Sequence, residues 1–328
     1  MLYLGSYSGG GAAGIGVVTV ADDGVPELGR AAACAPDPSY LAMAPEGRVV
    51  YAVHELEDGL VSAFAVDRPG VLRALGTQPS GGSHPCHVSV HPGGRYLLTA
   101  NHGSGSVAVH PIGGDGAPGP PSDVVEGGPR AHMAVADPAG RWVLAVHLGA
   151  GTVTTYRLDD RSGGLRPERE ARLHRGAGPR HLAFHPSGRA AYVVNELDST
   201  VTACAYDPGA GRLDPGPTVR TVPDGTEVEN YPSAILVSPD GRFVYVANRG
   251  HDSVAVLATG PTLRLVAAAP CGGGYPRDLA LDAGGRRLYA ANQRSGSVTC
   301  MPVDPAGGGV AGAAWRLPVP APTCLLPT

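Results

Sequence analysis

The sequence predicts an all-β fold, a seven-bladed β-propeller with four antiparallel strands in each blade and one blade closed by both termini. Three observations support this prediction. One segment recurs six times at steps of 44 to 53 residues, each copy consists of short alternating runs, and the two ends of the chain complement each other as parts of a seventh copy. Helical periodicity is absent throughout.

Each copy supplies the first two strands of a blade. An apolar run, usually opened by Pro, leads through a turn that is usually Pro-x-Gly-Arg into a β-branched or aromatic run that ends in Asn or His. The glycine of each Gly-Arg pair falls at positions 47, 94, 140, 188, 241 and 285. The first residue of each copy precedes its Gly-Arg glycine by nine positions, and the final Asn or His follows that glycine by seven. Gly and Pro at fixed spacing between alternating runs indicate strands joined by tight turns.

Two further runs complete each blade. A third alternating run begins at Val61, Ser106, Thr152, Thr200, Ser253 and Ser297. A fourth, weaker run follows a Gly-rich turn in each copy. Four strands in a repeat of this length are typical of a propeller blade.

The chain ends predict the seventh blade. The run that starts at Pro322 matches the first strand of a copy, residues 2–7 match the second, and residues 16–20 supply the third. Closure of this kind pairs strands that would otherwise be exposed edges. An open β-array or two β-sandwiches would not need complementary ends. We therefore expect a single propeller domain over residues 1–328.

Composition excludes several classes of protein. The net charge of −4 provides no basic surface for nucleic acid, and all 25 basic residues are Arg, which excludes lysine Schiff-base chemistry and a P-loop. No signal peptide or membrane-length apolar run is visible, so we expect a soluble, cytoplasmic protein with no membrane partner. The six cysteines lack CxxC or metal-type spacing and are expected to be reduced and mostly buried.

Two columns of equivalent positions are expected to converge around one end of the central channel, where first strands start and second strands end. The residues after the leading Pro are Ser39, Cys86, His132, Arg180, Ser233, Arg277 and Thr323. The residues after the Asn/His position are Glu55, His102, Leu148, Glu196, Arg249, Gln293 and Tyr7. Converging arginines repel one another unless an anion or carboxylates neutralise them, and Arg binds carboxylate and phosphate well. The columns therefore predict an anion site that uses Arg180, Arg249 and Arg277, unless Glu55 and Glu196 only form inter-blade salt bridges with them.

His132 and Glu196 are the predicted proton-transfer pair, because both titrate and both can face the cavity. Glu55 and His102 are further predicted substrate-binding residues. His87 and His181 follow one place later in their strands, so alternation predicts that they point to the other side in structural roles. The Asn/His position at the end of the second strands is nearly uniform, so we expect its residues to form hydrogen bonds between blades. These residues are His54, Asn101, His147, Asn195, Asn248 and Asn292.

No metal or other cofactor is predicted. The histidines of the first strands are out of register with one another, and no oxygen-rich cluster accompanies them. A serine nucleophile lacks the sequence context of a nucleophile elbow. The long insertion at residues 221–232 carries Glu227, Glu229 and Tyr231 and is expected over the channel face, as a substrate lid or as a plain surface loop.

The chain resembles the lactonase-type seven-bladed propellers, which include propeller 6-phosphogluconolactonases and fungal carboxy-muconate lactonizing enzymes. The resemblance covers the whole chain and rests on PSYLAMAPEGR, PCHVSVHPGGR, GAGPRHLAFHPSGR, VVNELDSTVT and YVANRGHDSVAV. It implies a metal-independent site for a small anionic lactone. It also implies an acid/base role for His132, anion binding by Arg180 and Arg249, and a site carboxylate at Glu196.

Three functions follow as hypotheses. The leading one is hydrolysis of a small carboxylated or phosphorylated lactone at the channel mouth. The second is ring closure or isomerisation of an unsaturated acid by the same groups. The third is a non-catalytic propeller that serves as a binding scaffold, because a fold does not fix a function. The sequence leaves the oligomeric state open.

Overall fold

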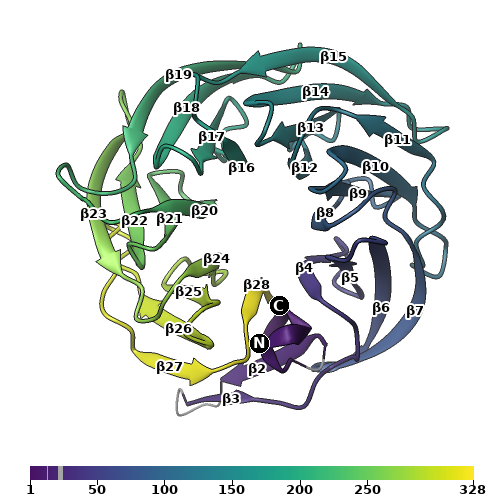
Figure 1. The fold of residues 1–328 in the computed structure, drawn as a ribbon, viewed down its shortest axis with the longest axis horizontal. Coiled ribbons are helices and arrows are strands. Elements are labelled where there is room, and N and C mark those ends of the chain that lie inside the picture. Colours follow the sequence, from purple (N-terminus) through teal and green to yellow (C-terminus); the bar gives the residue numbers. More distant parts are fainter. Residues whose placement is uncertain (13, 21–24) are drawn as a thin grey trace.

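The structure, a computed structural model, describes residues 1–12, 14–20 and 25–328. Its strands form seven four-stranded antiparallel sheets, arranged as blades around a central channel (Figure 1). The only helical segment in the described part of the chain is one 3-10 turn, η1 (Ser8–Gly10). The predicted seven-bladed propeller is therefore confirmed.

Each blade contributes one strand to each of four concentric layers. The innermost strands are β4 (Pro38–Met43), β8 (Pro85–Val90), β12 (Ala131–Ala136), β16 (Pro179–Phe184), β20 (Tyr231–Val237), β24 (Pro276–Leu281) and β28 (Pro322–Pro327). The second strands are β5 (Val49–His54), β9 (Tyr96–Asn101), β13 (Trp142–His147), β17 (Ala190–Asn195), β21 (Phe243–Arg249), β25 (Arg287–Asn292) and β1 (Leu2–Ser6). The third strands are β6 (Leu60–Arg68), β10 (Ser106–Pro111), β14 (Thr152–Leu158), β18 (Thr200–Asp207), β22 (Ser253–Ala258), β26 (Ser297–Pro302) and β2 (Gly16–Val20). The outer strands are β7 (Val71–Pro79), β11 (Asp123–Glu126), β15 (Leu165–Arg172), β19 (Arg212–Arg220), β23 (Arg264–Pro270), β27 (Trp315–Pro318) and β3 (Pro26–Leu28).

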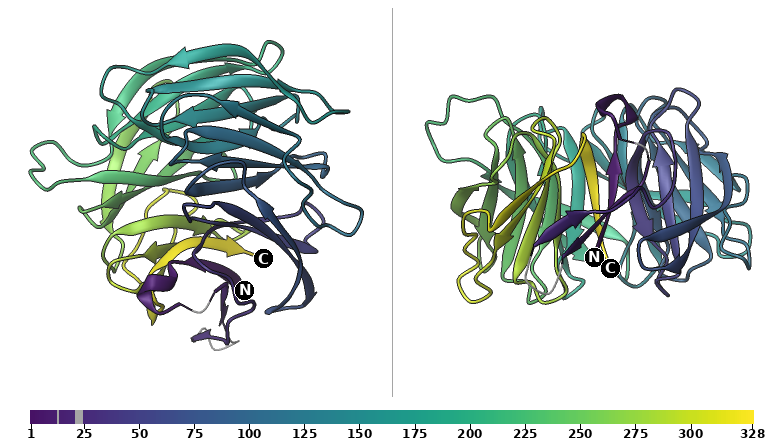
Figure 2. Two further views of the ribbon diagram at one scale, coloured as in Figure 1. Left: turned by 45° about the vertical axis from the view of Figure 1, so that its right-hand side comes forward. Right: turned by 90° about the horizontal axis from the view of Figure 1, so that it is seen from below.

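The closing blade is assembled from both ends of the chain, as predicted. Its strand order is β28-β1-β2-β3, and Tyr3 pairs with Leu326 while Leu4 pairs with Leu325. The amide of Thr328 donates to the carbonyl of Met1, so the two termini lie side by side at one face of the ring (Figure 2).

The core lies between neighbouring blades. The second strands are almost completely buried, whereas the outer strands are mostly exposed, with a few buried residues. One apolar cluster joins Leu144 and Val146 of one blade to Leu182 and Val193 of the next. Full burial of such a side chain stabilises the fold by about 1.5–3 kcal/mol. The ring therefore gains most of its stability at the blade-to-blade junctions.

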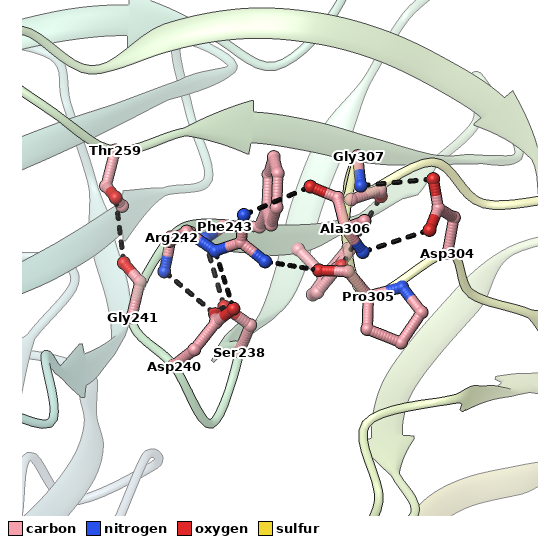
Figure 3. A network of polar contacts seen from close by, with 12 residues as sticks. Ser238, Asp240, Gly241, Arg242, Phe243, Thr259, Asp304, Pro305, Ala306 and Gly307 are labelled. Atoms are coloured by element: carbon pink, nitrogen blue, oxygen red, sulfur yellow. Dashed lines mark hydrogen bonds and ion pairs between the residues drawn. The ribbon is translucent and has the colours of Figure 1, made fainter.

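The repeated Gly-Arg turns also hold adjacent blades together (Figure 3). The Arg242 guanidinium donates to the carbonyls of Pro305 and Ala306 in the next blade, at 2.7 and 3.1 Å. At the equivalent junction of an earlier blade, the Arg141 side chain donates to the Pro208 carbonyl at 2.7 Å. At these two junctions, the arginine of the turn thus has a structural role.

A β-bulge near the start of the inner strands determines which side chains face the channel. In β16, Pro179 pairs with Asn195 and His181 pairs with Val194, so Arg180 has no partner residue on β17. The same shift occurs in the blades of Pro38, Pro85, Ala131 and Pro276. A bulge interrupts the normal alternation of side chains. Two consecutive residues of an inner strand can therefore face the channel.

Candidate active site

The predicted columns meet because an inner strand starts where its neighbouring second strand ends. Pro179 pairs with Asn195, which places Arg180 and Glu196 at adjacent strand ends of one blade. Every blade except the third contributes a polar or thiol-bearing side chain to both columns. The residues of these positions gather into three contacting groups.

The first group is an ion-pair cluster from two blades. Glu196 Oε2 lies 3.2 Å from Arg180 Nε and 2.7 Å from Arg249 Nη2. A backbone carbonyl also holds each guanidinium, because Arg180 Nη1 donates to Ser233 at 2.7 Å and Arg249 Nε donates to Tyr231 at 2.8 Å. Burial and the neighbouring Arg249 lower the pKa of Arg180 to about 10, which leaves it charged at neutral pH.

The second group joins the closing blade to the blades on either side of it. The Tyr7 hydroxyl donates to Glu55 Oε2 at 2.7 Å and accepts from Arg277 Nη2 at 2.7 Å. Arg277 Nη2 also lies 3.7 Å from Glu55 Oε2. Burial, opposed by Arg277, raises the pKa of Tyr7, so the phenol remains protonated. Tyr7 stands in the predicted column, although no role for it follows from the repeat.

The third group is a set of imidazoles. The ring of His132 packs edge-on against His102 and His181, with centroids 5.6 and 5.1 Å away. Burial, Arg180 and the neighbouring histidines lower the pKa of His132 well below its usual range, so its imidazole is neutral at pH 7. Its Nδ1 has no hydrogen-bond partner in the described part of the chain. Neutral imidazole is the form that can accept a proton.

The prediction that His87 and His181 point away from the channel is wrong. Tyr40, His87 and His181 come from the first, second and fourth blades along the chain, yet their rings contact one another with centroids 4.5 to 6.0 Å apart. Rings from blades that are not neighbours can meet only across the channel axis. The bulge explains the error, because it directs both Arg180 and His181 inward. We call Tyr40, His87 and His181 the aromatic plug.

Within the described residues, no hydrogen bond or ion pair joins His132 to Glu196. The Glu196 carboxylate is instead bound by Arg180 and Arg249. His102 belongs to the imidazole group, and Glu55 and Arg277 belong to the Tyr7 group. The structure thus brings all seven predicted site residues into three contacting groups, although it does not pair the two predicted proton-transfer residues directly.

Charge accounting favours an anionic ligand for this site. The two ion-pair groups contain three arginines, Arg180, Arg249 and Arg277, but only two carboxylates, Glu55 and Glu196. One positive charge is left without a counter-charge inside these groups. A single carboxylate or phosphate would neutralise it through the charge-assisted hydrogen bonds that Arg forms well.

The remaining column members serve the scaffold. Cys86, Ser233 and Thr323 each donate to a backbone carbonyl of the next inner strand. The residues of the Asn/His column are all buried. Among them, Asn101 and Asn248 bond the segment that arrives from the preceding blade, through the carbonyls of Ser80 and Thr221. This observation confirms the structural interpretation of the column for those residues.

The insertion at residues 221–232 is tied down at both ends. The Asn230 side chain bonds to Thr221 and Asn248, and Tyr231 opens β20 and supplies the carbonyl that holds Arg249. Between these anchors, Glu227 and Glu229 are exposed. The loop projects from the same face as η1, opposite the termini (Figure 2).

The described residues include no group of three or more His, Cys, Asp or Glu side chains placed to hold a metal ion. In the same part of the chain, no helix has the length and apolar character needed to cross a membrane. All six cysteines are free thiols, and only Cys34 is exposed.

The fold and the site together define a class: propellers that hold arginine, glutamate and histidine where inner strands start and second strands end. The family model for "Lactonase, 7-bladed beta-propeller" matches residues 1–327, so the chain belongs to this lactonase family. Bacillus subtilis 6-phosphogluconolactonase is 38% identical over 270 residues, which cover 77% of this chain and 76% of that protein. The Pectobacterium carotovorum 6-phosphogluconolactonase is 36% identical over 211 residues, which span 64% of this chain and 63% of its own length. The solved structure of the Pseudomonas aeruginosa periplasmic gluconolactonase superposes with a TM-score of 0.92 at 32% identity, covering 99% of this chain and 97% of that one.

Proposed function

We propose that the protein hydrolyses a small anionic lactone, carboxylated or phosphorylated, without a metal ion, as a 6-phosphogluconolactonase-like enzyme acting at the channel mouth. The observation that carries this proposal is the buried Arg180–Glu196–Arg249 cluster, which lies in the same set of strand ends as the neutral His132. Membership of the lactonase family and relatives named 6-phosphogluconolactonase support it.

The reaction uses water as the nucleophile. His132 accepts a proton from water as the water oxygen bonds to the lactone carbonyl carbon, which gives a tetrahedral oxyanion. An arginine of the cluster stabilises the oxyanion. The bond from that carbon to the ring oxygen then breaks, and the imidazolium of His132 returns its proton to the leaving oxygen. The products are a hydroxyl group and a carboxylic acid, which releases its own proton to solvent.

The arginines have divided tasks in this scheme. Arg180 is held by Glu196 and by the Ser233 carbonyl, so it can present a fixed donor to the oxyanion. Arg249 and Arg277 hold the carboxylate or phosphate of the substrate. Glu196 positions Arg180 and Arg249, because both guanidinium groups occupy its Oε2. A phosphorylated substrate accords with the cytoplasmic location expected from the sequence, which stays a prediction.

The test is a pH-stat measurement of acid release from phosphorylated sugar lactones, unphosphorylated sugar lactones and carboxylated muconolactones. We expect His132→Asn to lower kcat on the accepted lactone by about a hundred- to ten-thousand-fold, as for loss of a general base. Arg249→Ala should raise KM for the anionic lactone more than for its uncharged analogue. Analysis of the product as ring-opened acid distinguishes hydrolysis from cyclisation.

His185→Asn is the matched control, because His185 follows an inner strand at the face of the Gly-Arg turns and bonds only locally to Ser187. Its turnover should equal that of the parent protein. Unchanged turnover of a folded His132→Asn protein on every accepted lactone would refute the role of His132. Absence of turnover by the parent on all three lactone classes would refute the proposed function.

A further inference from the structure

A cavity lies on the side of the aromatic plug away from the candidate active site. Its volume is about 500 Å³, within the range of small-molecule sites. Its walls are apolar side chains of the inner strands, including Ile235, Val237, Leu281 and Leu325. Tyr40 and His181 of the plug line it at one end. At the other end the lining includes turn residues such as Pro239 and Ala283, so the cavity reaches the face opposite the candidate active site.

The charge of this cavity is opposite to that of the arginine groups. Among the described residues that line it, two are aspartates, Asp278 and Asp282, and none is an arginine. Asp278 is 7% exposed, and Oδ2 of its carboxyl accepts a hydrogen bond from the Leu325 amide at 2.8 Å. No ion pair involves Asp278 within the described chain. A buried carboxylate without a paired cation is costly, and burial raises its pKa to about 6.

Three polar side chains line this cavity. They are Asp278, Tyr40 and His181, of which His181 is 5% exposed. His181 Nε2 is occluded and has no hydrogen-bond partner in the described part of the chain, so it faces packed atoms rather than the cavity. Burial and Arg180 lower the pKa of His181 well below its usual range, so its ring is uncharged at neutral pH. The Asp278 carboxylate is therefore the charged group of these three, and a cationic occupant would pair with it.

We propose that this cavity binds a small primary alkylammonium ion, with its NH₃⁺ group on Asp278 and Tyr40 and its apolar tail along the inner strands. An ammonium group can donate hydrogen bonds to carboxylate and phenol oxygens, and its charge neutralises the carboxylate. The apolar wall accommodates an alkyl chain. This site is separate from the proposed lactone site and does not depend on it.

The experiment is titration calorimetry of the full chain with octylammonium, octyltrimethylammonium, octanol and octanoate at pH 7.5. We expect octylammonium to bind at one site. Octyltrimethylammonium, which lacks N–H donors, and octanol, which lacks charge, should bind more weakly by on the order of tenfold or more, and octanoate more weakly still. Octanol or octyltrimethylammonium binding as tightly as octylammonium would overturn the proposal, as would no binding of octylammonium.

Asp278→Asn should weaken octylammonium binding by on the order of tenfold or more, because it removes the charge and keeps an oxygen for the Leu325 amide. Val237→Trp places a bulky ring in the cavity at the last residue of β20 and should abolish binding. Asp240→Asn is the matched control, because Asp240 lies on the same face but does not line the cavity, and its affinity should be that of the parent. Thermal melts identify any variant that fails to fold. Unchanged affinity in folded Asp278→Asn or Val237→Trp would overturn the proposal.

Discussion

Two consecutive residues of each inner strand carry different chemistry. The first position contains His132, Arg180 and Arg277, whereas the next contains the aromatic plug and Asp278. The bulge directs both positions inward, so the channel is basic on one side of the plug and acidic on the other. A shift of one residue along a strand therefore separates the proposed lactone site from the cavity beyond the plug.

The plug histidines make stability depend on pH. Burial, reinforced by Arg180, lowers the pKa of His87 to about 3, against the ordinary value of 6.5 in the unfolded chain. Between these values the unfolded chain binds more protons, so the free energy of unfolding falls as the pH drops below 6.5. His87→Phe removes this effect. Relative to the parent protein, the variant should therefore gain about 2 kcal/mol of stability between pH 7 and pH 5.

Urea unfolding of the two proteins at pH 7, 6 and 5 measures this difference. Asp278 has a pKa raised to about 6 by burial and acts in the opposite direction, but it is present in both proteins and cancels. A stability difference that does not change with pH would contradict a buried neutral His87.

The sequence was sufficient to predict which residues gather at the strand ends, because equivalent positions of a repeat occupy equivalent places in a ring. It was not sufficient for His87 and His181. Their placement was inferred from strict alternation, and the bulge that breaks alternation leaves no composition signal beyond the leading proline. Salt bridges of Glu196 with the arginines were predicted only as an alternative, because spacing does not encode which carboxylate meets which guanidinium.

At the scale of the element, the hairpins between third and outer strands act as the inter-blade joints. In the joint of Figure 3, Gly308 closely follows the residues that Arg242 binds, and its φ of 70° is left-handed. The turn glycines 241 and 285 have similar φ values of 76° and 62°. A Cβ at position 308 would lie 2.3 Å from the Phe243 ring. Glycine at this position therefore allows both the turn and the close packing of two blades.

Gly308→Ala should destabilise the protein by about 2 kcal/mol or more, because it adds left-handed strain to a collision with a packed ring. The adjacent Gly309→Ala is the matched control, since a Cβ there would meet nothing within 4 Å. Denaturant midpoints of the two variants measure the effect. Equal midpoints would show that the joint tolerates a side chain at position 308.

The predicted first and second strands agree with the structure because their Pro, Gly-Arg and Asn/His signals recur in nearly every blade. The outer strands were less clear in the sequence, and β11 and β27 have only four residues each. Outer strands have little buried surface, so few of their positions require an apolar residue. Their bounds depend on pairing with the third strand rather than on their own pattern.

At the scale of the whole molecule, ring closure depends on β28. Cys324 and Leu325 are buried in two different apolar clusters, one shared with the first complete blade and one with the preceding blade. Thr323 donates to the Ser39 carbonyl at 2.9 Å, and the Leu325 amide donates to Asp278. One short strand thus connects the last blade, the first blade and the cavity beyond the plug.

A chain that ends at Ala321 should lose about 5 kcal/mol or more, because it loses these buried side chains and leaves both β1 and Asp278 without their partners. Its unpaired β1 edge should also favour association between chains. Denaturant unfolding followed by circular dichroism, together with size-exclusion chromatography, measures both effects. A chain that lacks only the exposed Thr328 is the control and should behave like the parent. If the chain ending at Ala321 kept the parent's midpoint and remained monodisperse at the parent's elution volume, the six complete blades would hold the ring without β28, and closure would not be a source of its stability.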